Sequence, residues 1–550
     1  MIQKNIKVKI PSKTVRYSNN GIYYEVSRTY NSNKKYNTPN RICIGKAIDD
    51  EYMNPNENYE TYFPNESLLK EPPLLSDTLS IGFTSVVDKL IDDLQIDLIL
   101  KDYYTDDEYS LIRDLIVYMI SYSTTVIQHF PSASRRFDIL SNTIRSDSYI
   151  STFFKEVITD KKIEQFLNDW NLLDRKKDVL YISYDSTNMN TNAVGIELAE
   201  YGHPKEDEEL PQVNLSYVIN KSDCLPLFYE LYPGSNIDNS QLKHMVDRLS
   251  EYGYKNIGVI LDRGYYSRYN INYLRDKGYD FLLMVKTNSE IIEKHIQEKQ
   301  YSINKEKYYI EAHDVFGTTI EDKIFENDKV KSFIHIYYDS SRSMDEAKLL
   351  YRNVSNEAKQ LDEHILKHHK KDDLKSEYKH FKLQADKEGY LVSYTKNDDL
   401  IETEARSLGF FSIITSSKMS ASDALDAYRD RDSVEKLFES LKSELDYKKF
   451  RVNTGRSLAG KTFITFLATV IRSRIYYNSK PLRKNDRKQY TTNAIINELS
   501  NIEITKNAKD IYTRRYSLTA KQKNILSKFN ISEKDIILTT NSINNRLTSK

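Results

Sequence analysis

The order of strand and helix patterns between residues 179 and 285 restricts the fold of this 550-residue chain more than any other feature. Three segments typical of strands come first, and two amphipathic helices then alternate with two short apolar strands. The expected strands are 179–185, 212–220, 224–232, 257–261 and 281–285, and the expected helices are 239–252 and 267–277. A continuously apolar strand is buried on both faces, so this order predicts an open α/β sheet. The length predicts two to four domains.

Two of these strands lead into a carboxylate. Asp185 ends the first expected strand, and Asp262 follows 257–261, with Gly264 allowing the turn after it. Open α/β sheets carry their chemistry at the carboxyl ends of strands. We therefore expect both aspartates at the same edge of the sheet, each at a strand end.

A third carboxylate, Glu435, lies on a helix expected over 420–449, where Ser420 and Asp423 are typical of an N-terminal cap. On a helical wheel, Glu435 falls within about 60° of three side chains able to bind phosphate. These are Tyr428, Arg431 and Lys442. Val434, Leu437, Phe438, Leu441 and Leu445 form an adjoining apolar stripe. A solvated face with i,i+4 ion pairs is the alternative interpretation of this helix.

Three converging carboxylates repel one another unless divalent cations lie between them. Mg²⁺, for which Mn²⁺ can substitute, prefers such hard oxygen ligands, and a pair of ions can promote in-line phosphodiester displacement. The expected catalytic and metal-binding residues are therefore Asp185, Asp262 and Glu435. Residues 442–488 hold 13 Lys/Arg against 3 Asp/Glu although the whole chain is neutral, which predicts a basic face for DNA. The candidate DNA contacts are Tyr428, Arg431, Lys442, Arg263, Lys448 and Lys449.

The pattern Tyr428-x2-Arg431-x3-Glu435-x6-Lys442 resembles the Tyr-Arg-Glu-Lys signature of bacterial insertion-sequence DDE transposases, in the 1634-like branch of the insertion sequence 4 superfamily. The segments 184–187 (YDST) and 261–265 (LDRGY) look like the first and second acidic motifs of that family. The resemblance covers about 178–480. It implies an RNase H-like fold, Mg²⁺ dependence, terminal inverted repeats as substrate and a homodimer on double-stranded DNA. It also implies cut-and-paste transposition, in which water nicks one strand and the freed 3′-hydroxyl attacks the complementary strand and later the target.

Six segments follow from these patterns. Residues 1–75 are expected to form a small β meander and linker, a candidate DNA-binding arm, and 76–177 a helical domain that is a candidate for binding DNA ends. The RNase H-like core spans 178–289 and 406–480, interrupted by an inserted subdomain at 290–405 with a helix over 356–382. Residues 481–550 form a helical tail, a candidate dimer or DNA contact. The 290–405 segment lacks the tryptophan that relatives stack on a flipped base, and its candidate substitutes are Tyr308, Tyr309, Phe316 and Tyr337.

Cysteine content and hydropathy limit the class of protein. Cys43 and Cys224 are the only cysteines, which argues against a disulfide framework or a thiolate zinc site. The first residues lack the apolar segment of a signal peptide, and no apolar run approaches the ~20 residues that span a bilayer. We expect a cytoplasmic, nucleoid-associated protein without a membrane contact.

His364, His368 and His369 are expected to be solvated rather than metal-bound, and Glu439 is the fallback third carboxylate.

Two other interpretations stay open. Residues 455–462 (GRSLAGKT) satisfy the P-loop pattern of nucleotide-binding proteins, although no buried strand is expected before them. The chain can also be an inactive DNA-binding protein descended from a transposase.

Overall fold

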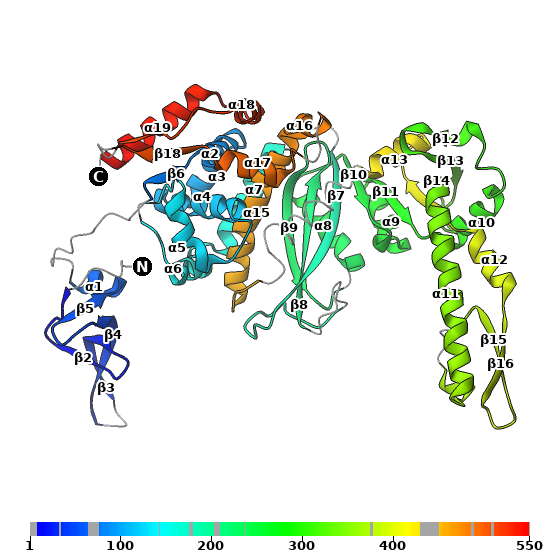
Figure 1. Ribbon diagram of the computed structural model, residues 1–550, viewed down its shortest axis with the longest axis horizontal. Coiled ribbons are helices and arrows are strands. Elements are labelled where there is room, and N and C mark those ends of the chain that lie inside the picture. The colour runs from blue at the N-terminus through cyan, green and yellow to red at the C-terminus, as the bar shows by residue number, and fades with distance from the viewer. Residues whose placement is uncertain are drawn as a thin grey trace. The chain divides into compact units, whose positions relative to one another are not determined.

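The computed structural model describes residues 8–31, 35–63, 76–141, 143–174, 180–202, 210–236, 238–374, 378–429, 450–485, 489–507 and 511–548. The chain divides into two compact units (Figure 1). Met1–Ile163 and Arg456–Lys550 form the first unit, and Glu164–Gly455 forms the second. In the described part of the chain, no helix has both the length and the apolar character needed to cross a bilayer.

A nine-stranded sheet is the centre of the second unit, in the order β12-β13-β14-β17-β11-β10-β7-β8-β9. Its strands are β7 (Leu180–Asn190), β8 (Gln212–Asn220), β9 (Leu225–Pro233), β10 (Ile257–Leu261), β11 (Asp280–Val285), β12 (Tyr309–Ile310), β13 (Val315–Asp322), β14 (Ser332–Tyr338) and β17 (Phe410–Thr415). β7, β8 and β9 form an antiparallel meander, β10 and β11 run parallel to β7, and the other neighbours pair antiparallel. The predicted order of the first five strands is confirmed.

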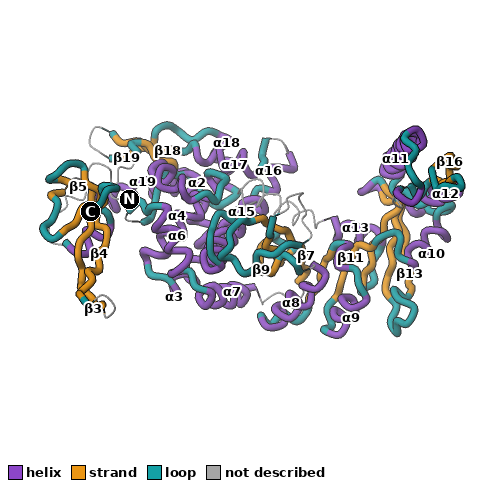
Figure 2. The backbone as a smooth tube through the Cα atoms, turned by 90° about the horizontal axis from the view of Figure 1, so that it is seen from below, coloured by secondary structure: helices purple, strands orange, loops and turns teal. Residues whose placement is uncertain are grey.

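Helices lie on both sides of this sheet. α8 (Asp238–Glu251) connects β9 to β10, and α9 (Arg268–Asp276) connects β10 to β11. α13 (Ala421–Arg429) follows β17. Figure 2 shows α13 on one side of β11 and α8 and α9 on the other. The two helices predicted between these strands are confirmed, with boundaries within a residue of those expected.

The prediction that Asp185 ends a strand is wrong. β7 continues to Asn190, and its second half pairs only with β8, from Asp185↔Tyr217 to Asn190↔Gln212. The polar residues of this half stay in the strand because they are buried with hydrogen-bond partners. The amide of Asn188, for example, donates to Gln212 Oε1 at 2.8 Å.

The first part of the 290–405 segment adds strands to the main sheet, and its second part packs around a core of its own. α10 (Glu290–Lys299) and β12 to β14 come first, and β14 pairs with β17 in the main sheet. α11 (Ser340–Leu366) then packs against β15 (Phe381–Ala385), β16 (Leu391–Lys396) and α12 (Asp398–Arg406) around a small apolar core. The helix predicted at 356–382 is therefore misplaced. Asp339 caps its true start, and His368 has a left-handed φ of 53° that a right-handed helix cannot continue through.

The three histidines at the end of α11 are not all solvated. His364 is half-buried, its Nδ1 lies 2.7 Å from Nδ1 of His369, and its Nε2 lies 2.9 Å from the Tyr378 hydroxyl. His368 and His369 are exposed, as expected. The prediction is wrong for His364 because the turn after α11 folds Tyr378 back onto the helix.

The N-terminal β meander is confirmed. Its strands are β1 (Val8–Lys9), β2 (Thr14–Arg16), β3 (Gly21–Asn31), β4 (Tyr36–Ala47) and β5 (Tyr52–Pro55), followed by α1 (Glu57–Tyr62). The turn between β2 and β3 precedes Gly21, with Asn20 at a φ of 60°. Ile22, Ile44, Met53 and Tyr59 form its core.

The rest of the first unit is mainly helical. Its helices include α2 (Gly82–Asp93), α3 (Ile96–Tyr103), α4 (Asp106–Ser121), α5 (Phe130–Ala133), α6 (Asp147–Thr152), α15 (Gly455–Asn478), α16 (Lys480–Asn485), α17 (Thr492–Ser500), α18 (Ala520–Ser527) and α19 (Glu533–Thr548), while α7 (Asp160–Asp174) continues into the second unit. α2 and α3 are separate helices because Gln95, between them, has a left-handed φ of 57°. The tail is not entirely helical either. β18 (Glu503–Lys506) pairs with β6 (Thr78–Ser80) and β19 (Tyr512–Arg514).

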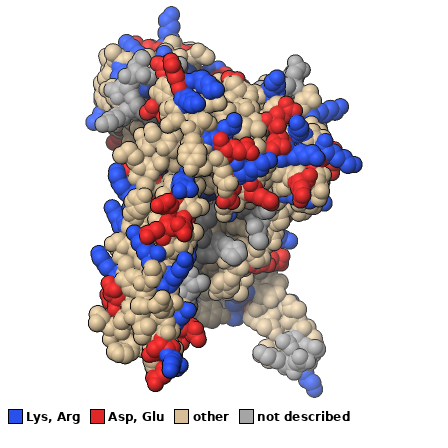
Figure 3. Space-filling model, turned by 90° about the vertical axis from the view of Figure 1, so that its right-hand side faces the viewer, with Lys and Arg blue, Asp and Glu red and all other residues tan. Residues whose placement is uncertain are grey.

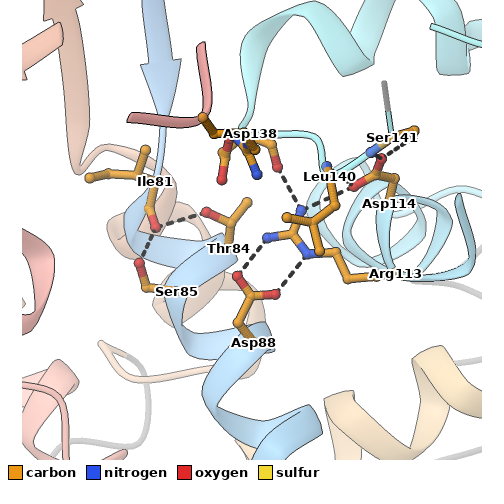
Figure 4. Close-up of polar contacts among 10 residues, drawn as sticks. Ile81, Thr84, Ser85, Asp88, Arg113, Asp114, Asp138, Leu140 and Ser141 are labelled. Carbon is orange, nitrogen blue, oxygen red and sulfur yellow. Dashed lines mark hydrogen bonds and ion pairs between the residues drawn. The ribbon is translucent and has the colours of Figure 1, made fainter. Parts of the chain in front are cut away.

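One buried arginine joins the helices of this unit (Figure 4). The Arg113 side chain is fully buried and donates to both Asp88 carboxylate oxygens at 2.7 Å, to the Asp138 carbonyl at 2.6 Å and to Asp114 at 3.1 Å. Asp114 in turn accepts from the backbone amides of Leu140 and Ser141. Arg113 therefore links α2, α4 and the 138–141 loop.

Replacing Arg113 with Met should destabilise the first unit by about 3–5 kcal/mol, because Asp114 then stays buried without its cation. Hydrogen exchange of α4 peptides in increasing urea measures this unit alone. Arg515→Met is the matched control, since Arg515 pairs with Glu503 but is 52% exposed, and such surface pairs contribute at most about 1 kcal/mol. Equal losses in the two variants would contradict this account of Arg113.

Candidate active site

The parallel pairing of β7 with β10 brings the two predicted aspartates together. The register runs from Ile257↔Leu180 to Ile260↔Ser183. Asp262 follows with extended backbone angles, φ −80° and ψ 165°, so two further steps along the register place it beside Asp185. Neighbouring strands lie ~4.8 Å apart. Two residues remote in sequence thus have their backbones side by side in the sheet.

Both aspartates belong to the sheet face that α13 covers. Residues two apart on a strand share a face, so Asp262 lies on the side of Ile260. Ile260 packs in one core with Ala421 and Leu425 of α13. The side chains of Asp185 and Asp262 are half-buried in an otherwise buried region.

Backbone amides hold each carboxylate in place. The amide of Ser186 donates to Asp185 Oδ1 at 2.8 Å, and the amide of Arg263 donates to Asp262 Oδ1 at 2.6 Å. Arg263 itself is exposed at the first residue of the short 3₁₀ helix after β10. These amide bonds fix the rotamers of two hard oxygen donors, which are the ligand type that Mg²⁺ prefers.

α13 begins as the sequence predicts. It places Tyr428 near the row of neighbouring strand residues that contains Asp185 and Asp262. The amide of Asp423 donates to Ser420 Oγ at 3.1 Å, which confirms the cap. The half-buried Tyr428 donates its hydroxyl to Met284 Sδ at 3.4 Å. The β10–β11 register, extended by one step beyond Leu261↔Leu283, places Met284 beside Asp262. The Tyr428 hydroxyl therefore lies one strand away from Asp262 and two from Asp185.

The other candidates on this helix, Arg431, Glu435, Glu439, Lys442, Lys448 and Lys449, lie outside the described residues. Both flanks of 430–449 are fixed within the second unit. α13 packs on the sheet before it, and after it the amide of Gly455 donates to the carbonyl of Gly195 at 3.2 Å. A Cβ on Gly195 would collide with the carbonyl of Asn453. In the described parts of the chain, no three His, Cys, Asp or Glu side chains gather as a metal-binding group.

The basic stretch at 442–488 does not form one face. Lys461 and Arg472 point into the core, with exposed fractions of only 1% and 4%. Elsewhere, on the face in Figure 3, which is the right-hand side of Figure 1, Lys and Arg are interspersed with Asp and Glu. The predicted continuous basic face is therefore wrong for these two residues, because α15 is buried around most of its circumference.

The structure contradicts the P-loop interpretation. Residues 455–462 are the first turns of α15, without a strand in 450–454. Lys461 is buried within that helix. Gly460 lies where a Cβ would collide with the carbonyl of Phe154. The glycine thus permits close packing and forms no phosphate-binding loop.

One of the aromatic candidates is a core residue. Tyr337 is fully buried, stacks on Phe411 with ring centroids 4.8 Å apart, and donates its hydroxyl to the carbonyl of Ala421 at 2.7 Å. It cannot stack on a base. Tyr309 is 45% exposed and keeps its ring accessible.

Sequence analysis missed His335, which lies further along the row of the aspartates. The strand pairings link Met284↔Ile413 and Ile413↔His335. His335 is fully buried, with Nδ1 2.9 Å from Thr319 Oγ1 and Nε2 3.0 Å from Thr415 Oγ1. Burial lowers the pKa of this imidazole to about 4, so it is neutral. The sequence feature that could have identified His335 is its place among the inward-facing residues of the alternating strand β14.

Comparison with known proteins gives one match over much of the chain. Residues 180–471, more than half of the chain, match the family model described as transposase DDE domain. The chain is also similar to the piggyBac transposase in a cryo-EM structure of its synaptic complex with hairpin DNA, with 9% identity and a TM-score of 0.33. That similarity covers 76% of this chain and 70% of the other. No curated protein matches this chain.

His335 should make the second unit less stable in mild acid. Its pKa is about 4 in the folded chain in place of the ordinary 6.5, so unfolding takes up a proton between these values. The stabilisation is complete above pH 6.5 and is lost as the pH falls to 4, by roughly 3 kcal/mol. Urea unfolding followed by the fluorescence of Trp170, the only tryptophan, measures it. His335→Gln should show a flatter pH dependence over this range, and an unchanged slope would contradict the assignment.

Proposed function

Because the chain belongs to the transposase DDE domain family, we propose that it is a Mg²⁺-dependent DNA transposase that cuts at terminal inverted repeats and joins the 3′ ends to target DNA. The observation that carries this proposal is the placement of Asp185 beside Asp262, at the edge of the face that α13 covers. The signature on and after α13 supports assignment to the insertion sequence 4 superfamily, in its 1634-like branch. We assign β7 to β11 to the RNase H-like core.

Glu435 is the proposed third carboxylate. It follows Tyr428 by seven residues, a spacing at which two positions share one helix face. Tyr428 itself reaches Met284, one strand from Asp262. The two ordered aspartates would hold the metal ions together with Glu435. When bound, a pair of Mg²⁺ ions supplies nucleophile activation and charge neutralisation at the leaving oxygen.

The remaining roles belong to side chains that bind DNA. Tyr428, Arg431, Lys442, Arg263, Lys448 and Lys449 would contact phosphates by hydrogen bonds, most of them charge-assisted. Water would attack the phosphodiester at the transposon end, and the freed 3′-hydroxyl would attack the complementary strand and then the target. Double-stranded DNA and a second copy of the chain are the proposed partners. Residues 1–75, 76–177 and 481–550 are the candidates for end recognition or subunit contact.

Removing any one carboxylate should abolish strand cleavage without abolishing DNA binding. Asp185→Asn, Asp262→Asn and Glu435→Gln should each lower the rate of Mg²⁺-dependent nicking at least about 10³-fold, because each removes a metal ligand worth several kcal/mol in the transition state. The substrate is a labelled duplex carrying the inverted repeats that flank the coding region, and a mobility-shift assay measures binding in parallel.

Glu439→Gln is the matched control for Glu435→Gln and should cleave like the unaltered chain. Full cleavage by Glu435→Gln together with loss in Glu439→Gln would move the third carboxylate to Glu439. Binding of the repeats without cleavage by the unaltered chain, in either Mg²⁺ or Mn²⁺, would instead support an inactive DNA-binding protein.

A further inference from the structure

Two strands of the N-terminal meander continue beyond their neighbours. β2 lies beside β3 only as far as Tyr24, and β5 lies beside β4 only over Gly45–Ala47. Farther on, β3 and β4 pair with each other alone, from Ser27↔Asn40 to Asn31↔Tyr36 (Figure 1). Five residues of a strand span about 17 Å. We call residues 27–31 and 36–40 the ribbon.

The described residues cover neither face of the ribbon. The register shifts between Glu25 and Ser27, and such a bulge bends a strand and increases its twist. Of the ribbon residues whose exposure is described, none is buried. Tyr30 is 63% exposed and Tyr36 is 55% exposed. A two-stranded ribbon is at best marginally stable by itself, so the packing of the meander does not account for its length.

The charge of this part of the chain is strongly positive. Residues 1–48 contain ten Lys/Arg and a single acid, Glu25, although the whole chain is neutral. The next acids are Asp49, Asp50 and Glu51. They lie in the turn between β4 and β5, at the end of β4 that is opposite to the ribbon. A positive ribbon on a neutral protein complements a polyanion.

The edges of the ribbon are poorly suited to pairing with another strand. Pro39 in β4 has no amide hydrogen to donate, and Lys35 directly precedes this strand. Proline, lysine and a bulge are the features that protect an edge strand against strand addition. A partner therefore meets the side chains of the ribbon rather than its backbone.

The side chains of the ribbon are donors and acceptors held in fixed positions. On one face, the Asn40 amide donates to Ser27 Oγ at 3.1 Å and to Thr29 Oγ1 at 2.9 Å. On the other face, Arg28 Nε donates to Glu25 Oε1 at 2.5 Å. This bond orients a guanidinium whose side chain is 64% exposed, while Glu25 is only 23% exposed. The Nη groups of Arg28 can therefore donate to another acceptor.

We propose that the ribbon lies in the major groove of double-stranded DNA, where Arg28 contacts base edges and Lys35 contacts a phosphate. DNA as the partner rests on the proposed function, and the ribbon is the surface that meets it. The major groove is about 12 Å wide and 8.5 Å deep and admits a two-stranded ribbon. The ribbon is long enough to reach its floor. Arginine on guanine O6 and N7 is the commonest specific contact there.

Binding by the full-length chain tests the proposal, measured by fluorescence anisotropy without divalent cations over a range of KCl concentrations. The probes are a duplex with the inverted repeats that flank the coding region and an unrelated duplex. Arg28→Ala should weaken binding to the repeats about tenfold or more, and binding to the unrelated duplex less. Lys35→Ala should weaken binding to both duplexes and reduce the salt slope by about 0.9, the contribution of one phosphate contact.

Arg16→Ala is the matched control. It removes the same charge from the same meander, but Arg16 lies near the acidic turn and pairs with Asp50 at 3.0 Å. Its affinity and salt slope should equal those of the unaltered chain.

Methylation interference on the repeats identifies the groove. Guanine N7 lies in the major groove and adenine N3 in the minor groove. Methylation of N7 at the contacted guanine should weaken binding by the unaltered chain and should have no effect on Arg28→Ala, which has already lost that contact. Interference confined to adenine N3 would overturn the proposal, because the contact would then lie in the minor groove.

Equal losses in Arg16→Ala and the two ribbon variants would also overturn it, since only net charge would then matter. Failure of the proposed function gives a different result. In that case the ribbon variants still lose affinity for the repeats, while the unaltered chain binds the repeats and does not cleave them when Mg²⁺ or Mn²⁺ is added. A chain that binds neither duplex would overturn both proposals.

Discussion

The parallel pairing of β7 with β10 is the interaction on which the candidate site depends. It brings Asp185 and Asp262 side by side at strand spacing. Carboxylates that share a site repel each other when both are charged. The sheet imposes this repulsion, because its hydrogen bonds and apolar core fix both backbones. A bound cation would convert the repulsion into attraction, which makes this edge suited to metal-dependent phosphate chemistry.

Local patterns were enough to predict the order of β7 to β11, since each strand and helix carries its own periodicity. They also located the cap of α13 and the aspartate after β10. They failed where pairing between distant segments decides the structure. The second half of β7 is polar, and only β8 keeps it in the sheet. The sequence of β18 is that of a polar tail. It forms a strand because it pairs with β6, which lies more than 400 residues earlier in the chain.

Buried polar groups were the other source of error. The P-loop pattern at 455–462 matched every letter, yet Gly460 is small because α15 packs against the backbone of Phe154. Arg113 sits on a helix with many apolar residues, and although Asp114 is its neighbour in sequence, nothing local indicates its bonds to Asp88, 25 residues earlier. A one-dimensional pattern records residue types, whereas these roles depend on which backbone or charge lies opposite in space. The third carboxylate rests on spacing in the sequence, since Glu435 lies outside the described residues.

Burial differs between the two ends of one row of neighbouring residues across the sheet. The row consists of Asp185, Asp262, Met284, Ile413 and His335. His335 lies fully beneath the protein surface, where a charge would be costly, and it stays neutral between two threonine hydroxyls. The aspartates lie at the other end of the row and are only half-buried, so a ligand can reach them. α13 packs on Ile413 of this row, and the hydroxyl of its Tyr428 contacts Met284. The difference in burial along the row thus places the carboxylates, which can bind a ligand, at one end and the buried imidazole at the other.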